Sequence, residues 1–236
     1  MKVGDGITIG RANWDFGGNT PDHFVEHIAK SVPFYAEGHE LICYLSDYFI
    51  LRDSTCYELG VSTGELIKKL AGYNQHKPET KWIGIDNEEK MIKKAREHCS
   101  EVDNIELHHE DVLLFSYEKA DMIVSYYTIQ FIPERHRQDL FNKIYERLNW
   151  GGAFVFFEKV RGPDARFHDI VTSLYHDFKL RNGFSPEEII NKAQSLKGAM
   201  KPFTPQGNLD LLKRAGFVDM MTIMKYVCFE GFLAIK

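Results

Sequence analysis

Two short patterns in the sequence combine residue types that bind small polar ligands. The first is Glu58-x-Gly60-x-Ser62-x-Gly64, which follows an apolar run and comes directly before a predicted helix. Glycines at such a turn leave backbone N–H groups free at the helix start and let a ligand approach where no Cβ intrudes. The second is Asp86, at the end of the next apolar segment. A carboxylate there can accept hydrogen bonds from both hydroxyls of a ribose, so the two patterns together predict a nucleotide-like cofactor.

The glycine spacing distinguishes between two classes of cofactor. The dinucleotide fingerprint Gly-x-Gly-x-x-Gly would need glycines at the positions of Ser62 and Glu65. Its third glycine packs a helix against a strand, which Glu65 cannot imitate. The pattern instead resembles the S-adenosylmethionine (SAM) loop of class I methyltransferases. That resemblance implies that Glu58 and the loop backbone face the amino acid part of SAM and that Asp86 faces its ribose. The alternative is a glycine-rich turn without a ligand.

Composition narrows the function classes. The chain has 236 residues, of which 44% are hydrophobic and 27% charged, enough for one large α/β domain or a domain with a small cap. A formal net charge of −5 argues against direct nucleic-acid binding, which needs clustered Lys and Arg. No apolar run is long enough for a membrane span or signal peptide. Four scattered cysteines without metal-ligand spacing predict reduced thiols, a cytoplasmic protein and no metal site.

The order of predicted elements indicates the fold class. From residue 55 onward, apolar strands and amphipathic helices alternate, which predicts a parallel sheet with helices on both faces. Segments 217–224 and 226–235 predict a final hairpin that adds an antiparallel edge strand. We therefore expect an α/β class I methyltransferase (Rossmann-like) fold, with a seven-stranded, mostly parallel sheet whose last strand is antiparallel.

Two regions flank or interrupt this alternation. We expect residues 1–50 to form an N-terminal arm and a helical lid, with the glycine-rich first 20 residues loosely ordered. Residues 51–236 would form the SAM-binding domain with a helical insertion at 160–204, either a substrate cap or a dimer contact. Within the insertion, Ser185-x-x-Glu188 has the spacing of a capping box.

Further candidate cofactor residues follow from their places at strand ends or helix starts. Asp111 can accept from the adenine amino group while Val112 packs on the ring, although Asp111 could equally be a solvated loop residue. Tyr35 is either a core aromatic or a hydroxyl donor to the cofactor's carboxylate. Tyr126 ends the fourth strand, where side chains line the ligand crevice near the reacting end of the cofactor.

With these segments placed, the chain resembles one family, the carboxy-S-adenosyl-L-methionine synthases (CmoA). The resemblance spans roughly residues 24–236 and rests on Lys30-Ser31-Val32-Pro33-x-Tyr35, Glu58-Leu59-Gly60-x-Ser62-x-Gly64, Gly84-Ile85-Asp86-Asn87, Thr128-x-Gln130-Phe131, Lys143-Ile144-Tyr145-x-x-Leu148-Asn149-x-Gly151-Gly152, Glu158-Lys159, His176-Asp177-Phe178-Lys179-x-x-Asn182-Gly183 and Lys213-x-Ala215-Gly216-Phe217. It implies a homodimer that uses SAM and prephenate. Decarboxylation of prephenate supplies the carboxyl group placed on the SAM methyl, for wobble-uridine modification of tRNA.

Carried over position by position, the resemblance also implies individual SAM contacts. These fall on Tyr35, Gly60, Val61, Ser62, Asp86, Asn87, Asp111 and Val112. Two positions depart from the family pattern: an Asn is replaced by Tyr126, and an Arg donated across the dimer to the carboxylate of carboxy-SAM is replaced by Ala193. Arg suits a bidentate grip on a carboxylate, whereas Ala offers no charge.

Three functions are therefore weighed. The first is a SAM-dependent methyltransferase acting on a small molecule, which needs in-line positioning and, for a hydroxyl or amine acceptor, a base. Candidate catalytic residues, each of which could instead be structural, are His176, Tyr127, Glu158 and Asp177. The second is a carboxy-SAM synthase with a relocated cation, for which the candidates are Lys192, Lys197 and Arg181. The third is a SAM-binding protein without catalysis, such as a regulatory or assembly subunit.

Overall fold

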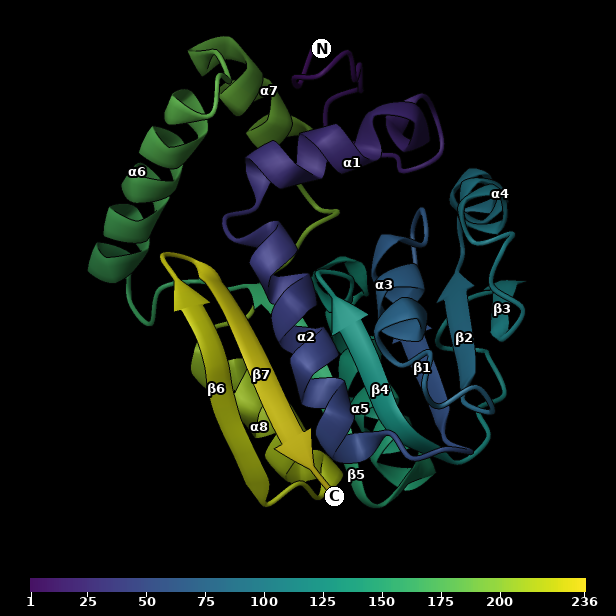
Figure 1. Cartoon of the computed structure of the whole chain (residues 1–236). Helices are drawn as coiled ribbons and strands as arrows, with labels where there is room; N and C mark the ends of the chain where they lie inside the picture. The colour runs from purple at the N-terminus through teal and green to yellow at the C-terminus, as the bar shows by residue number, and fades with distance from the viewer.

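A seven-stranded sheet forms the centre of the computed structural model, which describes residues 1–236 (Figure 1). The strand order is β3-β2-β1-β4-β5-β7-β6. The strands are β1 (Thr55–Leu59), β2 (Lys81–Asp86), β3 (Ile105–His109), β4 (Ala120–Tyr126), β5 (Leu148–Lys159), β6 (Asp219–Tyr226) and β7 (Phe229–Ile235). β1 to β5 are parallel, and β7 is antiparallel to both of its neighbours, β5 and β6. The antiparallel strand therefore lies inside the sheet and not at its edge as predicted, because β7 pairs with β5 and leaves β6 outermost. This confirms the predicted fold class.

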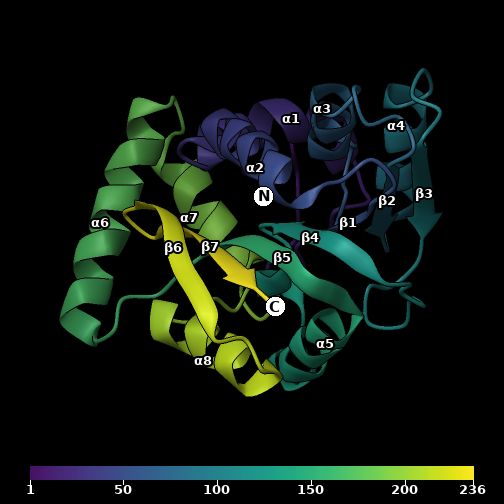
Figure 2. The same ribbon diagram turned by 60° about the horizontal axis from the view of Figure 1, so that its bottom comes forward.

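Helices cover both faces of the sheet. They are α1 (Thr20–Ser31), α2 (Tyr35–Phe49), α3 (Glu65–Tyr73), α4 (Glu89–His98), α5 (Glu134–Arg147), α6 (Ala165–Arg181), α7 (Pro186–Ser195) and α8 (Pro205–Ala215), with a 3-10 turn η1 (Ile129–Phe131). Figure 2 shows α2, α3 and α4 on one face and α5 and α8 on the other. None of the helices combines the length and apolar composition needed to cross a bilayer.

The central strands are apolar because both of their faces are covered. On β5, Phe154 and Phe156 pack toward α5, while Val155 and Phe157 face the other core, and all four are fully buried. Burying each such side chain contributes about 1.5–3 kcal/mol to folding relative to leaving it exposed. This firmly anchored sheet fixes the positions of the residues that follow the carboxyl ends of its strands.

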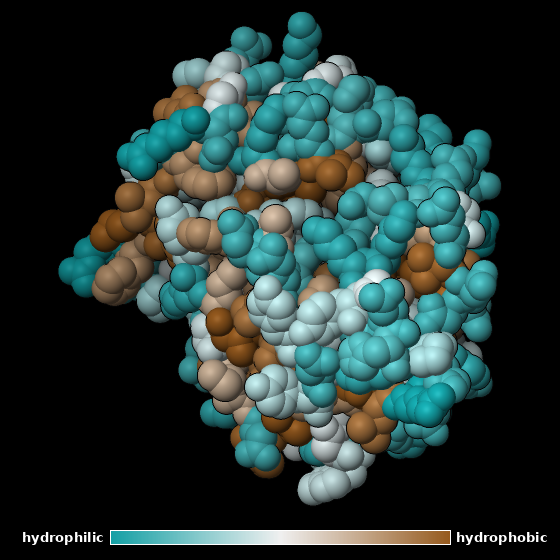
Figure 3. Space-filling model, viewed as in Figure 1, coloured by the Kyte–Doolittle hydropathy of each residue, from teal (hydrophilic) through white to brown (hydrophobic).

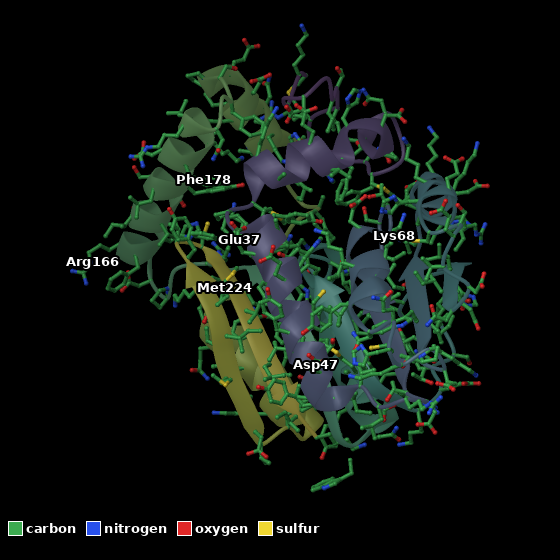
Figure 4. The ribbon with its side chains drawn as sticks, in the orientation of Figure 1. Glu37, Asp47, Lys68, Arg166, Phe178 and Met224 are labelled. Atoms are coloured by element: carbon green, nitrogen blue, oxygen red, sulfur yellow. The ribbon has the colours of Figure 1, made fainter.

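The strand order reverses between β1 and β4, because β2 and β3 extend the sheet on one side and β5 on the other. In open α/β sheets, ligands bind at this point, outside the carboxyl ends of the strands. Helix α1 runs across these strand ends, and α6 and α7 stand beside them near the β6–β7 edge (Figures 1 and 2). On α6, Phe178 extends toward α1, whereas Arg166 extends into solvent (Figure 4). The predicted capping box at the start of α7 is confirmed.

The N-terminal arm, residues 1–19, differs from its prediction. Instead of being loosely ordered, it buries Val3 and Ile7 completely, and the amino group of Met1 donates to the carbonyl of Ile9 at 2.8 Å. Asp5 in this arm forms ion pairs with two residues of α1. The prediction from glycine content was wrong because two spaced aliphatic side chains and one buried acid are enough to anchor a short arm.

Candidate active site

A cavity of about 1050 Å³ lies at the strand ends, enclosed by α1, α6 and α7. Its lining includes most of the predicted cofactor residues: Tyr35, Glu58, Gly60, Val61, Ser62, Asp86, Asn87, Asp111, Val112 and Tyr126. Gly64 lies just outside the lining, at the N-terminus of α3. In Figure 3, apolar side chains show in a hollow below α1. Ligand pockets usually enclose roughly 300–1,000 Å³, so this cavity has room for two small molecules.

The loop after β1 depends on glycine at position 60. Gly60 has φ +76°, and a Cβ there would collide with the side chain of Thr128. The N–H groups of Gly60 and Val61 donate to the carbonyl of Ile85 at 2.8 and 3.0 Å, which ties the loop to β2. Ser62 also has a positive φ, +52°. The loop therefore forms a cradle that a side chain at position 60 would fill.

Asp86 is held by two backbone donors. The N–H groups of Ser62 and Glu88 each donate to a different oxygen of its carboxylate, both at 2.9 Å. Burial raises the pKa of Asp86, against the effect of these two N–H groups. Each oxygen keeps a free lone pair, so both can accept hydrogen bonds from vicinal hydroxyls.

Glu58 is a buried carboxylate whose Oε2 has no hydrogen-bond partner. Burial, and to a smaller extent the charge of Asp86, raise its pKa well above the usual range. An unpartnered buried carboxylate oxygen is costly unless a donor comes to it, and the ammonium group of SAM is such a donor. With the glycine cradle and Asp86, this donor set fits SAM.

The adenine end is formed by the turn after β3. Asp111 Oδ1 accepts from the N–H of Leu113 at 2.9 Å, and its second oxygen has no partner. Val112 is buried beside it, with its carbonyl accepting from the hydroxyl of Tyr117 at 2.8 Å. We refer to this part of the cavity, from Glu58 through Asp86 to Asp111, as the cofactor end.

Tyr126 occupies space that a glycine of α2 leaves free. Its hydroxyl donates to the carbonyl of Tyr35 at 2.8 Å, and a Cβ at Gly38 would collide with that hydroxyl. The rings of Tyr126 and Tyr35 are 5.1 Å apart. Tyr126 therefore binds the start of α2 to the end of β4, and it fills the place of the family's Asn with an aromatic ring.

The four candidate catalytic residues lie in different environments, and one of them, Asp177, is exposed and does not line the cavity. Tyr127 lines the cavity, with φ +62° and a buried hydroxyl that has no partner. His176 lies at the rim, exposed, and its pKa is lowered by partial burial and by Lys179 and Lys159. Glu158 does not line the cavity, and burial raises its pKa to about 8.

The region around Glu158 is structural in character. Its carboxylate accepts from the backbone of Ile129 and Gln130, and the nearby Arg137 donates to the carbonyls of Ile132 and Gln130 at 2.9 and 3.0 Å. Glu158 and Arg137 therefore order the turn after β4 from behind the cavity wall.

The wall opposite the cofactor end carries three lysines. Lys159 comes from the end of β5, Lys179 from α6 and Lys192 from α7, and none of them forms an ion pair with a carboxylate. We call this part of the cavity the lysine chamber. Burial lowers the pKa of each of the three lysines. The charge of Lys159 lowers the pKa of Lys179 further, to about 7. The charges of Lys179 and Lys159 also lower the pKa of Lys192 further.

Lys192 is held from behind by a chain of side chains. Its Nζ contacts Nε2 of His27 and lies 3.3 Å from the hydroxyl of Ser31. His27 Nδ1 lies 2.9 Å from Asp5 Oδ2, and burial followed by the charge of Lys192 lowers the pKa of His27 to about 3. A neutral His27 that donates to Asp5 leaves Nε2 as an acceptor for Lys192.

Sequence reasoning named only part of this chamber. Lys192 was among the proposed replacement cations, and Lys197 also lines the cavity, whereas Arg181 does not. Lys159 and Lys179 were quoted only as family residues, and His27 was not named. A usable signal existed for Lys179, since it falls one helical turn after Tyr175 on the buried face of α6.

Comparison with known proteins supports the class of protein that the fold and cavity define. A family profile described as a methyltransferase domain matches residues 57–152. An O-methyltransferase family protein from Burkholderia thailandensis superimposes with a TM-score of 0.65 at 12% identity, covering 92% of this chain and 59% of that one. The structure of human N-acetylserotonin methyltransferase in complex with SAM superimposes with a TM-score of 0.55 at 18% sequence identity, and the match covers 93% of this chain and 62% of that one. The protein is a SAM-dependent enzyme of the class I methyltransferase fold.

Sequence relatives identify the family within that class. Carboxy-S-adenosyl-L-methionine synthase from Staphylococcus epidermidis is 40% identical over 94% of this chain and 97% of its own length. The synthase from Campylobacter lari is 33% identical over 94% of each chain. The chain belongs to the carboxy-S-adenosyl-L-methionine synthase family, as the motif resemblance indicated.

Proposed function

We propose that this protein makes carboxy-SAM, by placing a carboxyl group from an anionic donor on the methyl group of SAM. The observation that carries the proposal is that the cofactor end and the lysine chamber belong to one cavity. SAM, when bound, would supply the methyl carbon, which exchanges one C–H bond for the bond to the carboxyl carbon. The proton released there and the hydroxide that the donor loses on decarboxylation leave together as water. The donor that the family resemblance implies is prephenate, an anion suited to a wall of unpaired lysines.

Lys192 is the proposed substitute for the family's arginine. It is adjacent to Ala193 in the sequence, and both residues line the cavity. Its contacts with His27 and Ser31 fix the ammonium group at the wall. A carboxylate beside Lys192 would favour its charged form, which compensates for the burial that lowers its pKa. A lysine ammonium group is a point charge, whereas an arginine guanidinium group can bind both oxygens of a carboxylate. Lys192 would therefore make one strong hydrogen bond to the carboxylate in place of two.

The test is to incubate the purified protein with SAM and prephenate and to weigh the nucleoside products. We expect a species heavier than SAM by one carboxyl group. Lys192→Met should reduce its formation by about 100-fold, the loss of one buried charged hydrogen bond, while SAM affinity stays unchanged. Lys93→Met, an exposed lysine of α4, is the matched control. Absence of the carboxylated product from the unmodified protein would refute the proposal.

A second candidate function, methyl transfer to a small molecule, is favoured by His176. The lowered pKa of His176 leaves its imidazole ring neutral near pH 7, as a general base requires, and the residue lies at the cavity rim. Formation of S-adenosylhomocysteine with hydroxyl, amine or carboxylate acceptors would support this function. If neither product forms although SAM binds in calorimetry, a non-catalytic SAM-binding role is left.

The assembly state is part of the proposal. The outer face of α6 exposes Phe167, Ile170 and Leu174, each between 44% and 49% exposed, and brown atoms gather over α6 in Figure 3. Apolar patches of this kind mark interaction surfaces, and a second copy of the chain is the partner that the resemblance implies. Light scattering should give a dimer mass, and Ile170→Glu should shift it toward the monomer.

The remaining assignments follow from position and charge. We propose that α1 acts as a lid, since it crosses the strand ends, and that residues 160–204 act as the substrate cap, since they supply Lys179 and Lys192. All four cysteines are free and buried, which supports a reducing, cytoplasmic location. The net charge of −5 supports a small-molecule substrate without direct contact to nucleic acid.

A further inference from the structure

The lysine chamber contains a second cationic position besides Lys192. The ammonium groups of Lys159 and Lys179 lie 4.4 and 4.6 Å from the centre of the same ring, that of Tyr175. The hydroxyl of Tyr175 donates to the carbonyl of Ser31 at 2.9 Å, which fixes the ring beneath α1. One immobile aromatic ring thus positions two ammonium groups from different elements, one from β5 and one from α6.

Nothing in the protein neutralises this position. Lys159 and Lys179 form no ion pair, and Lys192 is near enough to add its own repulsion, so the three lysines share one chamber without a carboxylate among them. The acid whose charge acts on Lys192 is Asp5, and His27 stands between the two. Buried unpaired ammonium groups are costly, and an anion that enters the chamber removes the cost. Three ammonium groups in one chamber can pair with an anion that carries more than one negative charge.

A neutral donor completes the position. Tyr127 lines the same cavity and is only 6% exposed, and its hydroxyl is buried and has no partner. Tyr127 and Tyr175 both pack against Phe229, with ring centres 5.8 and 5.1 Å from it. The two tyrosines therefore belong to one aromatic cluster, from which Tyr127 reaches the cavity lining.

We propose that Lys159, Lys179 and the Tyr127 hydroxyl bind the second carboxylate of a dianionic donor, while Lys192 holds the other carboxylate. This inference rests on the proposed function, because it names the residues that would hold the second carboxylate of the donor that this function uses. A monocarboxylate would leave one of the two cationic positions unpaired. The chamber therefore discriminates by the number of charges as well as by shape.

Titration of Lys179 would make donor binding depend on pH. The groups that face Lys179 are Lys159 of β5, Lys192 of α7, His27 of α1, His176 of its own helix and the thiol of Cys228. None of these groups carries a negative charge at neutral pH, since burial raises the pKa of the Cys228 thiol. A carboxylate that binds Lys179 raises its pKa, so binding takes up a proton when the free lysine is neutral.

The test measures donor binding without turnover, by calorimetry on the full-length protein saturated with S-adenosylhomocysteine. The probes are prephenate, which carries two carboxylates, and phenylpyruvate, which carries one. We expect the unmodified protein to bind the dianion at least about tenfold more tightly, the effect of one charged hydrogen bond. Lys179→Met should abolish this preference, Tyr127→Phe should reduce it, and Lys179→Arg should retain most of it.

Several outcomes would overturn the inference. It is wrong if the unmodified protein binds both probes equally, or if Lys179→Met keeps the preference. S-adenosylhomocysteine affinity, expected to be equal in all variants, shows that each one is folded at the cofactor end, and Lys93→Met is the control for loss of a lysine. A preference for the dianion without any carboxylated product would refute the proposed function alone, and product formation without the preference would refute this inference alone.

Discussion

The two ends of the cavity are built in opposite ways. The cofactor end presents the carboxylates of Glu58, Asp86 and Asp111 at or just after the carboxyl ends of three adjacent strands. The lysine chamber presents ammonium groups from β5, α6 and α7, supported by α1 and the N-terminal arm. The first is made by a few turns close together in the sequence, and the second by five segments that meet only in the folded chain.

This contrast matches the charges of the two proposed substrates. SAM carries a positive sulfonium and a positive ammonium, whereas the donor is an anion. A cavity with acids at one end and lysines at the other orients both molecules, and it disfavours binding of either molecule at the end meant for the other. Changes at one end should therefore affect one substrate and leave the other unaffected, and the following predictions test that independence from the largest expected effect to the smallest.

The largest effect is expected at Gly60. Gly60→Val should weaken SAM binding by at least about 100-fold and lower the free energy of unfolding by about 2–4 kcal/mol, because the side chain meets Thr128 at a positive φ. Calorimetry and urea denaturation measure the two effects. Gly151→Ala is the control, since Gly151 also has a positive φ, +81°, but has no atoms near its Cβ position. Equal SAM affinity in the valine variant would contradict the cradle.

The second largest effect is expected at Asp86. Asp86→Ala is expected to weaken SAM binding by about tenfold, more than about 1 kcal/mol, because the hydrogen bonds to the ribose hydroxyls are charge-assisted. Donor binding in the presence of saturating SAM should stay unchanged. Asp103→Ala removes an exposed carboxylate from a nearby loop and serves as the control. The two-ended arrangement fails if Asp86→Ala weakens donor binding as much as SAM binding.

The effect of pH on donor binding should be smaller than the effects of these two substitutions, and it should depend on one lysine. The pKa of Lys179 in the free protein is about 7, and a bound carboxylate raises it. Donor affinity should therefore be flat below pH 7 and fall as the pH rises, by about fivefold between pH 7 and pH 8. SAM affinity should not follow this curve. Calorimetry at several pH values measures it, and an equally steep curve in Lys179→Met would assign the proton to another group.

The smallest effect is expected in the N-terminal arm. Asp5→Asn weakens the chain from Asp5 through His27 to Lys192, so carboxylation should lose about threefold in kcat/KM, with SAM affinity unchanged. Asp22→Asn, which breaks the exposed ion pair with Lys94, is the matched control. If both variants behave like the unmodified protein, the arm does not position Lys192.

The cofactor end could be predicted from the sequence because its chemistry is local. Position 60 requires glycine for its φ and its close contact with Thr128. Asp86 is held by the backbone N–H groups of Ser62, in the loop after the neighbouring strand, and of Glu88, two residues further along the chain. Parallel strand order then brings Asp111 to the same edge. Each of these residues follows from a motif plus one rule of sheet topology.

The lysine chamber could not be predicted in the same way. Glu158 was selected as a catalytic candidate from its strand-end position, but it lies behind the wall with its carboxylate on backbone donors. Its neighbour Lys159 points into the cavity instead, because successive side chains of a strand face opposite sides. The sequence named the pair Glu158-Lys159 without revealing which of the two faces the site.

By itself, the sequence determined the fold class, the SAM loop and the ribose-binding aspartate, because these depend on backbone conformation and on the alternation of strands and helices. Only the tertiary structure decided that Lys159, Lys179 and Lys192 share one chamber, and that an N-terminal aspartate supports the last of them through His27. The physical reason is that charge acts through distance in space, and residues 5, 27, 159, 179 and 192 become neighbours only when the insertion and the arm close over the strand ends.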